Sequence, residues 1–345
     1  MNIDLPIRAK GRFKLIRHTG HVFDENGRLV KMGDVIDETP FADNLFTYYG
    51  SAFYLNKGDH EISVAVSSSS VPPTMKGPGV NTTAVMGRSS ATLLESVTSR
   101  SGLPDSDGNL YWRTTYRFTF PQMVGGGIAT FRQASTSVQS TEPIFVPLGS
   151  GAIPVTGGPI SAAMLDSPFT VDMATEDFDL VWEFTEILNV EKAGVVLVPV
   201  VDAFGVVKST SEHTYRIRPA NFFNTDNDHA GWNEMTGREF PKTTTFPWSF
   251  QCGVGVIGDY ASQPVFSETI NVEAAGISAP WLGGTSCAVS LTYGLTDTTP
   301  SETINCVRLL VDHTDWQIDF DPPISKKARH RFLFNFNLSI VDRSV

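Results

Sequence analysis

Acidic side chains and histidines lie close together in two short segments that could bind a cation or perform acid–base chemistry. The first is NTDNDHAGWNE, residues 224–234, in which Asp226 and Asp228 alternate as the oxygen ligands of a calcium loop do. The glycine and the distal glutamate of the DxDxDG pattern are not at the positions that calcium binding requires. Ordinary surface loops carry the same residue types, so the sequence favours a polar loop here.

The second acidic segment is VDHTDWQIDFD, which ends at Asp321. In an extended chain Asp315, Asp319 and Asp321 have the same parity and face the same side. Carboxylates that share a face could hold a cation or act as a catalytic acid pair. The simpler interpretation is a set of solvated charges that prevents a sheet edge from pairing with another molecule.

Other motifs for catalysis or cofactor binding are missing from the sequence. No serine lies in a GxSxG elbow, and the glycine-rich runs GPGV and VGGGIA are not complete phosphate-binding or dinucleotide motifs. Cys252, Cys287 and Cys306 are far apart and lack the spacing of zinc ligands, which favours buried thiols in a reducing cytosol. We therefore expect no enzymatic activity, no cofactor and no metal.

Several tryptophans lie near glycine, proline or aspartate. Trp232, Trp281 and Trp316 could line a glycan-binding groove, because exposed aromatic rings on β-sandwiches commonly stack on saccharides. The alternative, which the sequence favours, is that these rings lie in the core or anchor loops.

The stretch GDVIDETPFADNLFTYYG, residues 33–50, combines acids with aromatic residues near the N-terminus. Such anchors are typical of protein interfaces, so we interpret this stretch and two preceding basic residues as a candidate partner-binding strip. An internal brace that pins the opening hairpin to the β core is an equal alternative. The members of the strip are Arg12, Lys14, Asp37, Glu38, Phe41, Asn44, Tyr48 and Tyr49.

The composition restricts the classes of partner. The chain has 26 Lys and Arg against 37 Asp and Glu, a formal net charge of −11, which argues against nucleic acid because non-specific affinity for phosphates comes from clustered basic residues. No apolar run is long enough to insert into a membrane or to act as a signal peptide. The expected partners are other proteins or a surface glycan.

Period-two patterns of apolar residues predict an all-β fold. In YWRTTYRFTF, residues 111–120, and FDLVWEFTEIL, residues 178–188, large apolar side chains alternate with other residues. Asn26-Gly27 predicts a hairpin turn in the opening segment. Residues 67–108 are poor in large apolar side chains and predict long loops.

We expect two antiparallel β-sandwich or jelly-roll-like domains with long loops and few short helices. The first would comprise residues 1–219, with the basic opening hairpin and the candidate strip, and the second residues 220–345. Pro219 ends a strand-like run and makes a plausible boundary between them.

The order of several motifs resembles that of a family of tailed-bacteriophage virion proteins. A G-R-F-x-L strand is followed by an acidic-Thr-x-x-x-x-Asn-Leu signature, an FTFP strand, a DLVWE strand and a terminal W-x-x-x-F-x-P-P-I-x-K segment. The resemblance covers nearly the whole chain, and the chain departs from the family at Pro40 and Ala42, where a Gly-Trp-Phe-type run is expected. The matching positions are Gly11, Arg12, Phe13, Leu15, Glu38, Thr39, Phe41, Asn44, Leu45, Trp316, Phe320, Pro323, Ile324 and Lys326.

This resemblance implies a non-enzymatic virion component, made in the bacterial host cytoplasm and associated with the tail, collar, baseplate or fibre. It would act in assembly or host attachment, in several symmetry-related copies. The implied partners are other virion proteins, copies of the chain itself and a host-surface glycan. The alternatives are a capsid decoration protein and a carbohydrate-binding or carbohydrate-degrading fibre module.

The first 31 residues carry more Lys and Arg than Asp and Glu, although the whole chain is acidic. A basic arm on an acidic body suits attachment to an acidic partner. Deleting residues 1–31 is therefore expected to leave a folded protein that no longer joins particles. The alternative is that these charges are the solvated face of the opening hairpin, and unfolding after the deletion would favour the internal brace.

Overall fold

The computed structural model of the chain is all-β, as the period-two patterns predicted. Within the described residues every regular element is a strand, and no helix has the length and apolarity needed to cross a membrane. The structure describes residues 2–26, 28–47, 60–74, 77–79, 85–86, 91–100, 105–148, 151–187, 189–202, 204–220, 249–260, 262–272, 277–278, 286–293, 299–311, 314–327 and 332–343.

Strands of very different length, from 2 to 22 residues, follow one another along the described part of the chain. They are β1 (Asn2–His18), β2 (Val22–Phe23), β3 (Leu29–Lys31), β4 (Val35–Glu38), β5 (Ala42–Asp43), β6 (Leu45–Phe46), β7 (His60–Ser67), β8 (Val85–Met86), β9 (Thr92–Arg100), β10 (Tyr111–Phe120), β11 (Ile128–Leu148), β12 (Gly151–Asp172), β13 (Asp177–Ile187), β14 (Lys192–Val201), β15 (Val207–Ala220), β16 (Ser249–Val256), β17 (Val265–Val272), β18 (Ile277–Ser278), β19 (Ser286–Tyr293), β20 (Thr303–Val311), β21 (Thr314–Ser325) and β22 (Phe332–Arg343).

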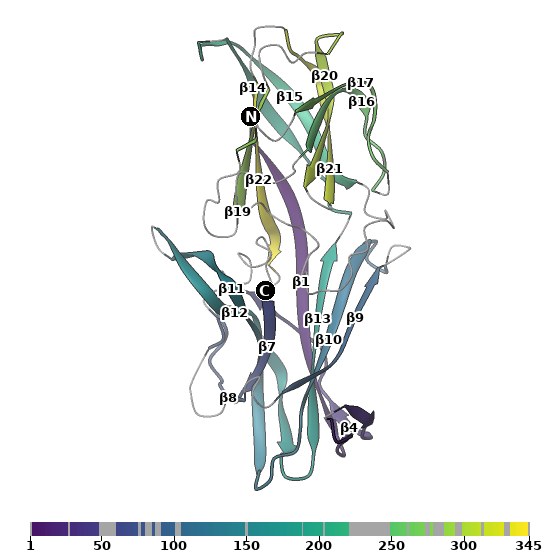
Figure 1. Cartoon of the computed structure of the whole chain (residues 1–345), viewed down its shortest axis with the longest axis vertical. Helices are drawn as coiled ribbons and strands as arrows, with labels where there is room; N and C mark the ends of the chain where they lie inside the picture. The colour runs from purple at the N-terminus through teal and green to yellow at the C-terminus, as the bar shows by residue number, and fades with distance from the viewer. Residues whose placement is uncertain are drawn as a thin grey trace.

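Two sheets form a sandwich in the lower half of Figure 1, which we call the lower sandwich. One sheet contains β1, β13, β10 and β9 in that order, and the other has the order β6-β12-β11-β7-β8. The predicted alternation is confirmed on β13, where Phe178, Leu180 and Trp182 are buried between the sheets. Tyr116 and Phe118 of β10 are buried beside them.

The upper half of Figure 1 contains a six-stranded sheet with the order β14-β15-β21-β20-β16-β17. Strands β19 and β22 also lie there, and together with β18 they extend the sheet that contains β1. The predicted division at residue 219 falls within β15, which is paired with β14 on one side and β21 on the other. By strand pairing, β14 and β15 therefore share a sheet with strands of the second half of the chain.

Strand β1 joins the two halves of the molecule. Its residues 2–9 pair in parallel with β22, and its residues 8–18 pair antiparallel with β13. A strand of 17 residues spans about 56 Å, so one uninterrupted element runs through both halves (Figure 1). The side chains of Phe13 and Leu15 are fully buried in the lower sandwich. Deleting residues 1–31 would remove this central strand, so we no longer expect the deleted protein to fold.

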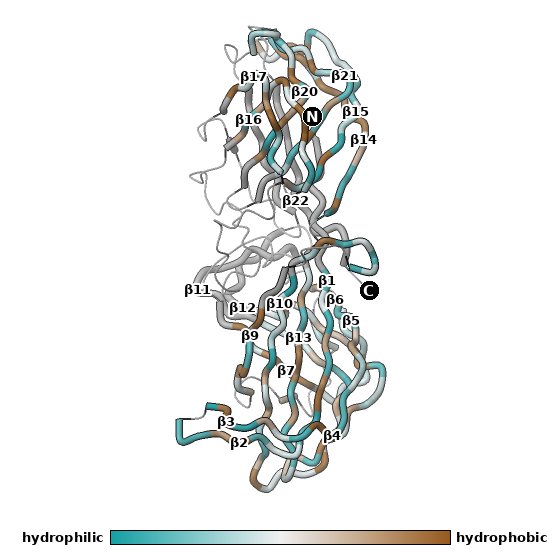
Figure 2. Tube along the Cα trace, turned by 90° about the vertical axis from the view of Figure 1, so that its right-hand side faces the viewer, coloured by the Kyte–Doolittle hydropathy of each residue, from teal (hydrophilic) through white to brown (hydrophobic). Residues whose placement is uncertain are grey.

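Two predictions for the first half of the chain have different outcomes. The hairpin predicted at Asn26-Gly27 is present, because β2 pairs with β3, and it projects from the lower end of the molecule (Figure 2). The prediction of long loops over residues 67–108 is wrong where β9 pairs along β10. This strand lies at a sheet edge and exposes Leu93 and Val97, so its sequence needs no alternating apolar face.

Candidate functional site

The segment from Gly33 to Thr47, which contains most of the candidate strip, closes one side of the lower sandwich. Strands β4 and β5 pair with β1, whereas β6 pairs with β12 in the opposite sheet. The segment thus connects the two sheets. This arrangement agrees with the internal-brace alternative.

Two polar residues fasten this segment to β1. The backbone N–H of Thr39 donates to the carbonyl of Leu15 (2.9 Å), and the Thr39 Oγ1 accepts from the N–H of Leu15 (3.0 Å). The N–H of Asn44 donates to the carbonyl of Gly11 (2.9 Å), and the Asn44 side chain is only 1% exposed. A Cβ at residue 11 would lie 2.5 Å from the Asn44 Nδ2, so this close approach requires glycine. The spacing of these motif residues therefore has a structural cause.

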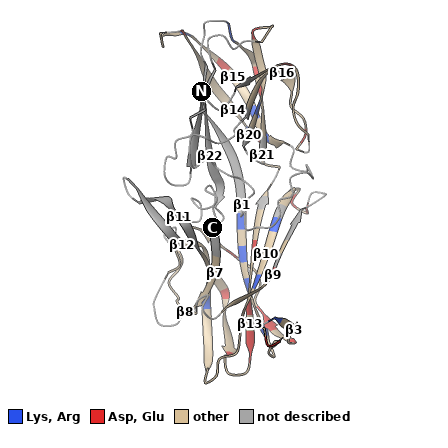
Figure 3. Ribbon diagram, in the orientation of Figure 1, with Lys and Arg blue, Asp and Glu red and all other residues tan. Residues whose placement is uncertain are grey.

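The charged members of the strip are paired within the chain. Arg12 Nε lies 2.7 Å from Glu183 Oε1, and Lys14 Nζ lies 2.8 Å from Glu38 Oε2. The guanidinium carbon of Arg12 also lies 4.1 Å from the ring centre of Phe41. Figure 3 shows this mixture of basic and acidic residues on β1 and its neighbours.

The strip is consequently not one continuous docking surface. Asn44 is buried and cannot contact a partner, which corrects that part of the prediction. Asp37 and Glu38 are exposed, and Tyr48 and Tyr49 lie outside the described residues.

Of the three tryptophans considered as glycan contacts, one is buried and two lie outside the described residues. Trp316 is 1% exposed, so the prediction that it faces a glycan is wrong. It lies on β21 with Ile318 and Phe320, and all three belong to the hydrophobic core. Trp232 and Trp281 lie outside the described residues.

A buried polar cluster at the lower end of the molecule was not found from the sequence. It consists of His18 at the end of β1, His21, Arg117 on β10, and Asp177 and Asp179 on β13. Asp179 is its centre: Oδ2 lies 3.0 Å from His18 Nε2 and 2.5 Å from Arg117 Nε, and Oδ1 lies 3.1 Å from His21 Nε2. Asp177 accepts hydrogen bonds from the backbone N–H groups of His21 and Gln122.

These contacts determine the charge of Asp179. Burial by itself would raise the pKa of this carboxyl, but hydrogen bonds from His18 and His21 and the positive charge of Arg117 outweigh burial and lower the pKa to about 2. Asp179 is therefore ionised at neutral pH. It holds together side chains from three separate strands or loops.

The three groups His18, His21 and Asp179 are close enough to ligate a metal ion, but their hydrogen bonds favour another role. The Nδ1 of His21 accepts from the N–H of Gly33 (2.9 Å), so the hydrogen-bond pattern assigns its proton to Nε2, the atom that faces Asp179. A metal on Nε2 would need that proton moved to Nδ1, against the Gly33 N–H, and would lie beside the Arg117 cation. The cluster is better suited to anchoring the base of the β2–β3 hairpin.

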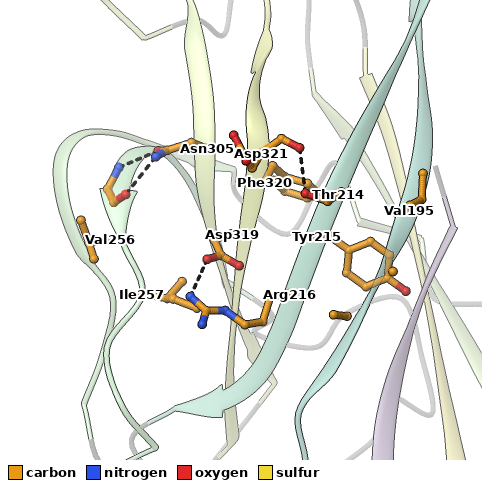
Figure 4. Close-up of a pocket in the computed structure, with 13 residues that line it drawn as sticks. Val195, Thr214, Tyr215, Arg216, Val256, Ile257, Asn305, Asp319, Phe320 and Asp321 are labelled. Atoms are coloured by element: carbon orange, nitrogen blue, oxygen red, sulfur yellow. Dashed lines mark hydrogen bonds and ion pairs between the residues drawn. The ribbon is translucent and has the colours of Figure 1, made fainter.

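A groove of about 670 Å³ crosses the outer face of the six-stranded sheet (Figure 4). Arg216 and Asp319 form an ion pair on its floor, with Nη2 2.8 Å from Oδ2. The side chains of Val195 and Val256 stand on opposite sides of that pair. The groove is lined by Ala193, Gly194, Val195, Thr214, Tyr215, Arg216, Gly255, Val256, Ile257, Asn305, Asp319, Phe320 and Asp321.

The groove contains part of the second acidic segment found in the sequence. Asp319 and Asp321 both line it, whereas the side chain of Asp315 is outside the described residues. Asp319 is held by Arg216, so it is not a free member of an acid pair. Burial, with the nearby charge of Asp319, raises the pKa of the Cys306 thiol to about 12, so this cysteine is not a ready nucleophile.

No family model matches the chain, and neither a curated protein nor a solved structure matches it.

Cys252 and Cys306 are buried free thiols, as the sequence predicted for them.

Proposed function

We propose that this chain is a non-enzymatic structural component of a tailed-bacteriophage virion, located in the tail, collar, baseplate or fibre, where it acts in assembly or host attachment. The observation that carries the proposal is the uninterrupted strand β1, which ties two β-sheet bodies into one elongated unit. A component of this kind needs a stiff body that keeps distant contact surfaces in register. The motif positions Gly11, Thr39 and Asn44, on which the resemblance rests, form the joint between β1 and its bracing segment.

The described side chains support a structural role over catalysis. An enzyme needs titratable groups that converge on an accessible site. Here His18 and His21 are both paired with the buried Asp179, and Asp319 forms an ion pair with Arg216.

The test is to locate the chain in purified particles. Particles would be separated on a density gradient and analysed by quantitative mass spectrometry, and a tagged chain would be imaged on them. We expect a fixed copy number and a position on the tail, collar, baseplate or fibre. A chain that stays entirely in the soluble fraction contradicts the proposal, and a label on the capsid surface assigns the decoration role instead.

A carbohydrate-binding fibre module is the second candidate, because the groove presents Arg216, Asp319 and Asp321 on one face. Incubation with purified host-surface polysaccharide separates the outcomes. Binding without cleavage would indicate an adhesin, and release of fragments would establish an enzyme.

A further inference from the structure

The turn between β14 and β15 lies at the upper end of the molecule (Figure 1), and it carries an exposed aromatic residue. Phe204 is 91% exposed, and Val206 and Val207 beside it are also exposed. The turn is held firmly, because Asp202 Oδ1 accepts hydrogen bonds from the N–H groups of Phe204 and Val206, each at 2.9 Å. We call residues 202 and 204–208 the hairpin tip. A fixed turn that exposes a phenyl ring is typical of an interface anchor.

The groove on the same sheet offers an apolar recess. Val195 and Val256 on its two sides are 60% and 72% exposed, and the ion pair on its floor is already satisfied within the chain. Its aromatic members, Tyr215 and Phe320, are buried, so none of the described lining residues offers an open ring on which a saccharide could stack. The recess therefore suits an apolar side chain better than a glycan.

The hairpin tip cannot reach the groove of its own molecule. Both features lie on β14 and β15, but Val195 in the groove is separated from Val201 at the start of the tip by six steps along a paired strand, about 20 Å. A tip seated in a groove must therefore come from a second copy.

We propose that copies of this chain associate head to tail, with the hairpin tip of one copy in the groove of the next. An apolar knob that fits a pocket elsewhere on the same molecule makes a heterologous contact, which closes into a ring or continues as a helix. Few unpaired charges would meet at this contact. The whole chain carries a net charge of −11, but residues 193–201 contain no charged residue, and the charges of the tip, Asp202 and Lys208, pair at 2.9 Å. In the groove Arg216 pairs with Asp319, which leaves Asp321 as the remaining charged lining residue.

The purpose given to this assembly rests on the proposed virion function, but the association itself is a property of the isolated chain. It is tested by sedimentation velocity of the purified full-length protein over a concentration series. We expect wild type to form oligomers as concentration rises. Phe204→Ser should remove the knob and Val256→Glu should place a charge in the recess. Each change is expected to weaken association about thirtyfold or more, as for loss of a buried aromatic anchor.

Mixing the two variants distinguishes a head-to-tail contact from a symmetric one. The Val256→Glu copy keeps an intact tip and the Phe204→Ser copy keeps an intact groove, so an equimolar mixture should form one-to-one dimers and nothing larger. Leu93→Ser, which removes an exposed apolar side chain from β9 in the lower sandwich, is the matched control and should associate as wild type does.

Three results would overturn the proposal. They are a wild type that remains monomeric at its highest soluble concentration, variants that still associate, and a mixture that stays monomeric. If wild type is monomeric and Val256→Glu instead loses binding to host-surface polysaccharide, the groove belongs to a glycan. Presence of the chain in particles is measured separately. The virion proposal can therefore fail while the head-to-tail association is confirmed, and the association can fail while the virion proposal is confirmed.

Discussion

The buried carboxylate of Asp179 leads to a prediction about stability in acid. Its pKa is about 2 in the folded chain against an ordinary value of 3.8, a difference of about 1.8 units, which corresponds to about 2 kcal/mol of folding free energy. Because the folded pKa is the lower one, this stabilisation is fully present above pH 4. It is lost progressively as the pH falls from about 4 towards 2.

The perturbation that isolates this contribution is Asp179→Asn, which keeps the shape of the side chain and removes its charge. At pH 6 the free energy of unfolding of the variant should be several kcal/mol lower than that of wild type, because Arg117 is left as a partly buried cation without its partner. Between pH 5 and pH 2 the difference in unfolding free energy between wild type and variant should shrink by about 2 kcal/mol.

Urea denaturation followed by tryptophan fluorescence measures this difference, since Trp182 is buried in the same sandwich. Asp34→Asn, at an exposed acid near the β2–β3 hairpin, is the control, and its effect should be small at every pH. A difference between wild type and Asp179→Asn that stays constant from pH 5 to pH 2 would refute the assignment of Asp179 as the charged centre of the cluster.

Three further predictions concern β1 and its brace. Gly11→Ala should lower the free energy of unfolding by about 1–3 kcal/mol in chemical denaturation, because the new Cβ meets Asn44, and adding Asn44→Ala should recover part of the loss. Thr39→Val should lower the free energy of unfolding by about 1 kcal/mol, because it removes the acceptor for the Leu15 N–H, whereas Thr39→Ser keeps the hydroxyl and should lower it less. Equal losses of unfolding free energy in the two variants would contradict the hydrogen-bond explanation. Deletion of residues 1–31 should abolish the cooperative thermal transition seen by circular dichroism, and a deleted protein that still melts cooperatively would show that β1 is dispensable.

The strands that could be predicted from sequence are those with a strictly buried face. Apart from Thr114 and Glu186, every second side chain on one face of β10 and β13 is large and apolar, and the pairing of Tyr116 with Trp182 brings these two faces together in one core. Edge strand β9 exposes Leu93 and Val97, and none of its described side chains is buried, so its composition resembled that of a loop. The all-β class follows from residues near in sequence, but the order of strands within the sheets does not.

The polar cluster could not be predicted for a different reason. His18 and Asp179 are separated by 161 positions, and neither lies in a motif that indicates the other. Only the antiparallel register of β1 and β13, which pairs His18 with Asp177, brings the histidine beside these acids. The same register explains the paired state of Arg12, which lies opposite Glu183.

Part of the basic character of the N-terminal segment, that of Arg12 and Lys14, is thus explained by pairing within the fold. On β1 the apolar residues Phe13 and Leu15 face the core, whereas Arg12 and Lys14 face outward among the acids of neighbouring strands. Cross-strand pairs of opposite charge stabilise a sheet, so basic residues on β1 stabilise its pairing with strands that carry acidic residues. Charges already paired in this way give little attraction for an acidic docking partner. Contact surfaces are therefore better sought where apolar side chains remain exposed, as at Phe204 on the hairpin tip.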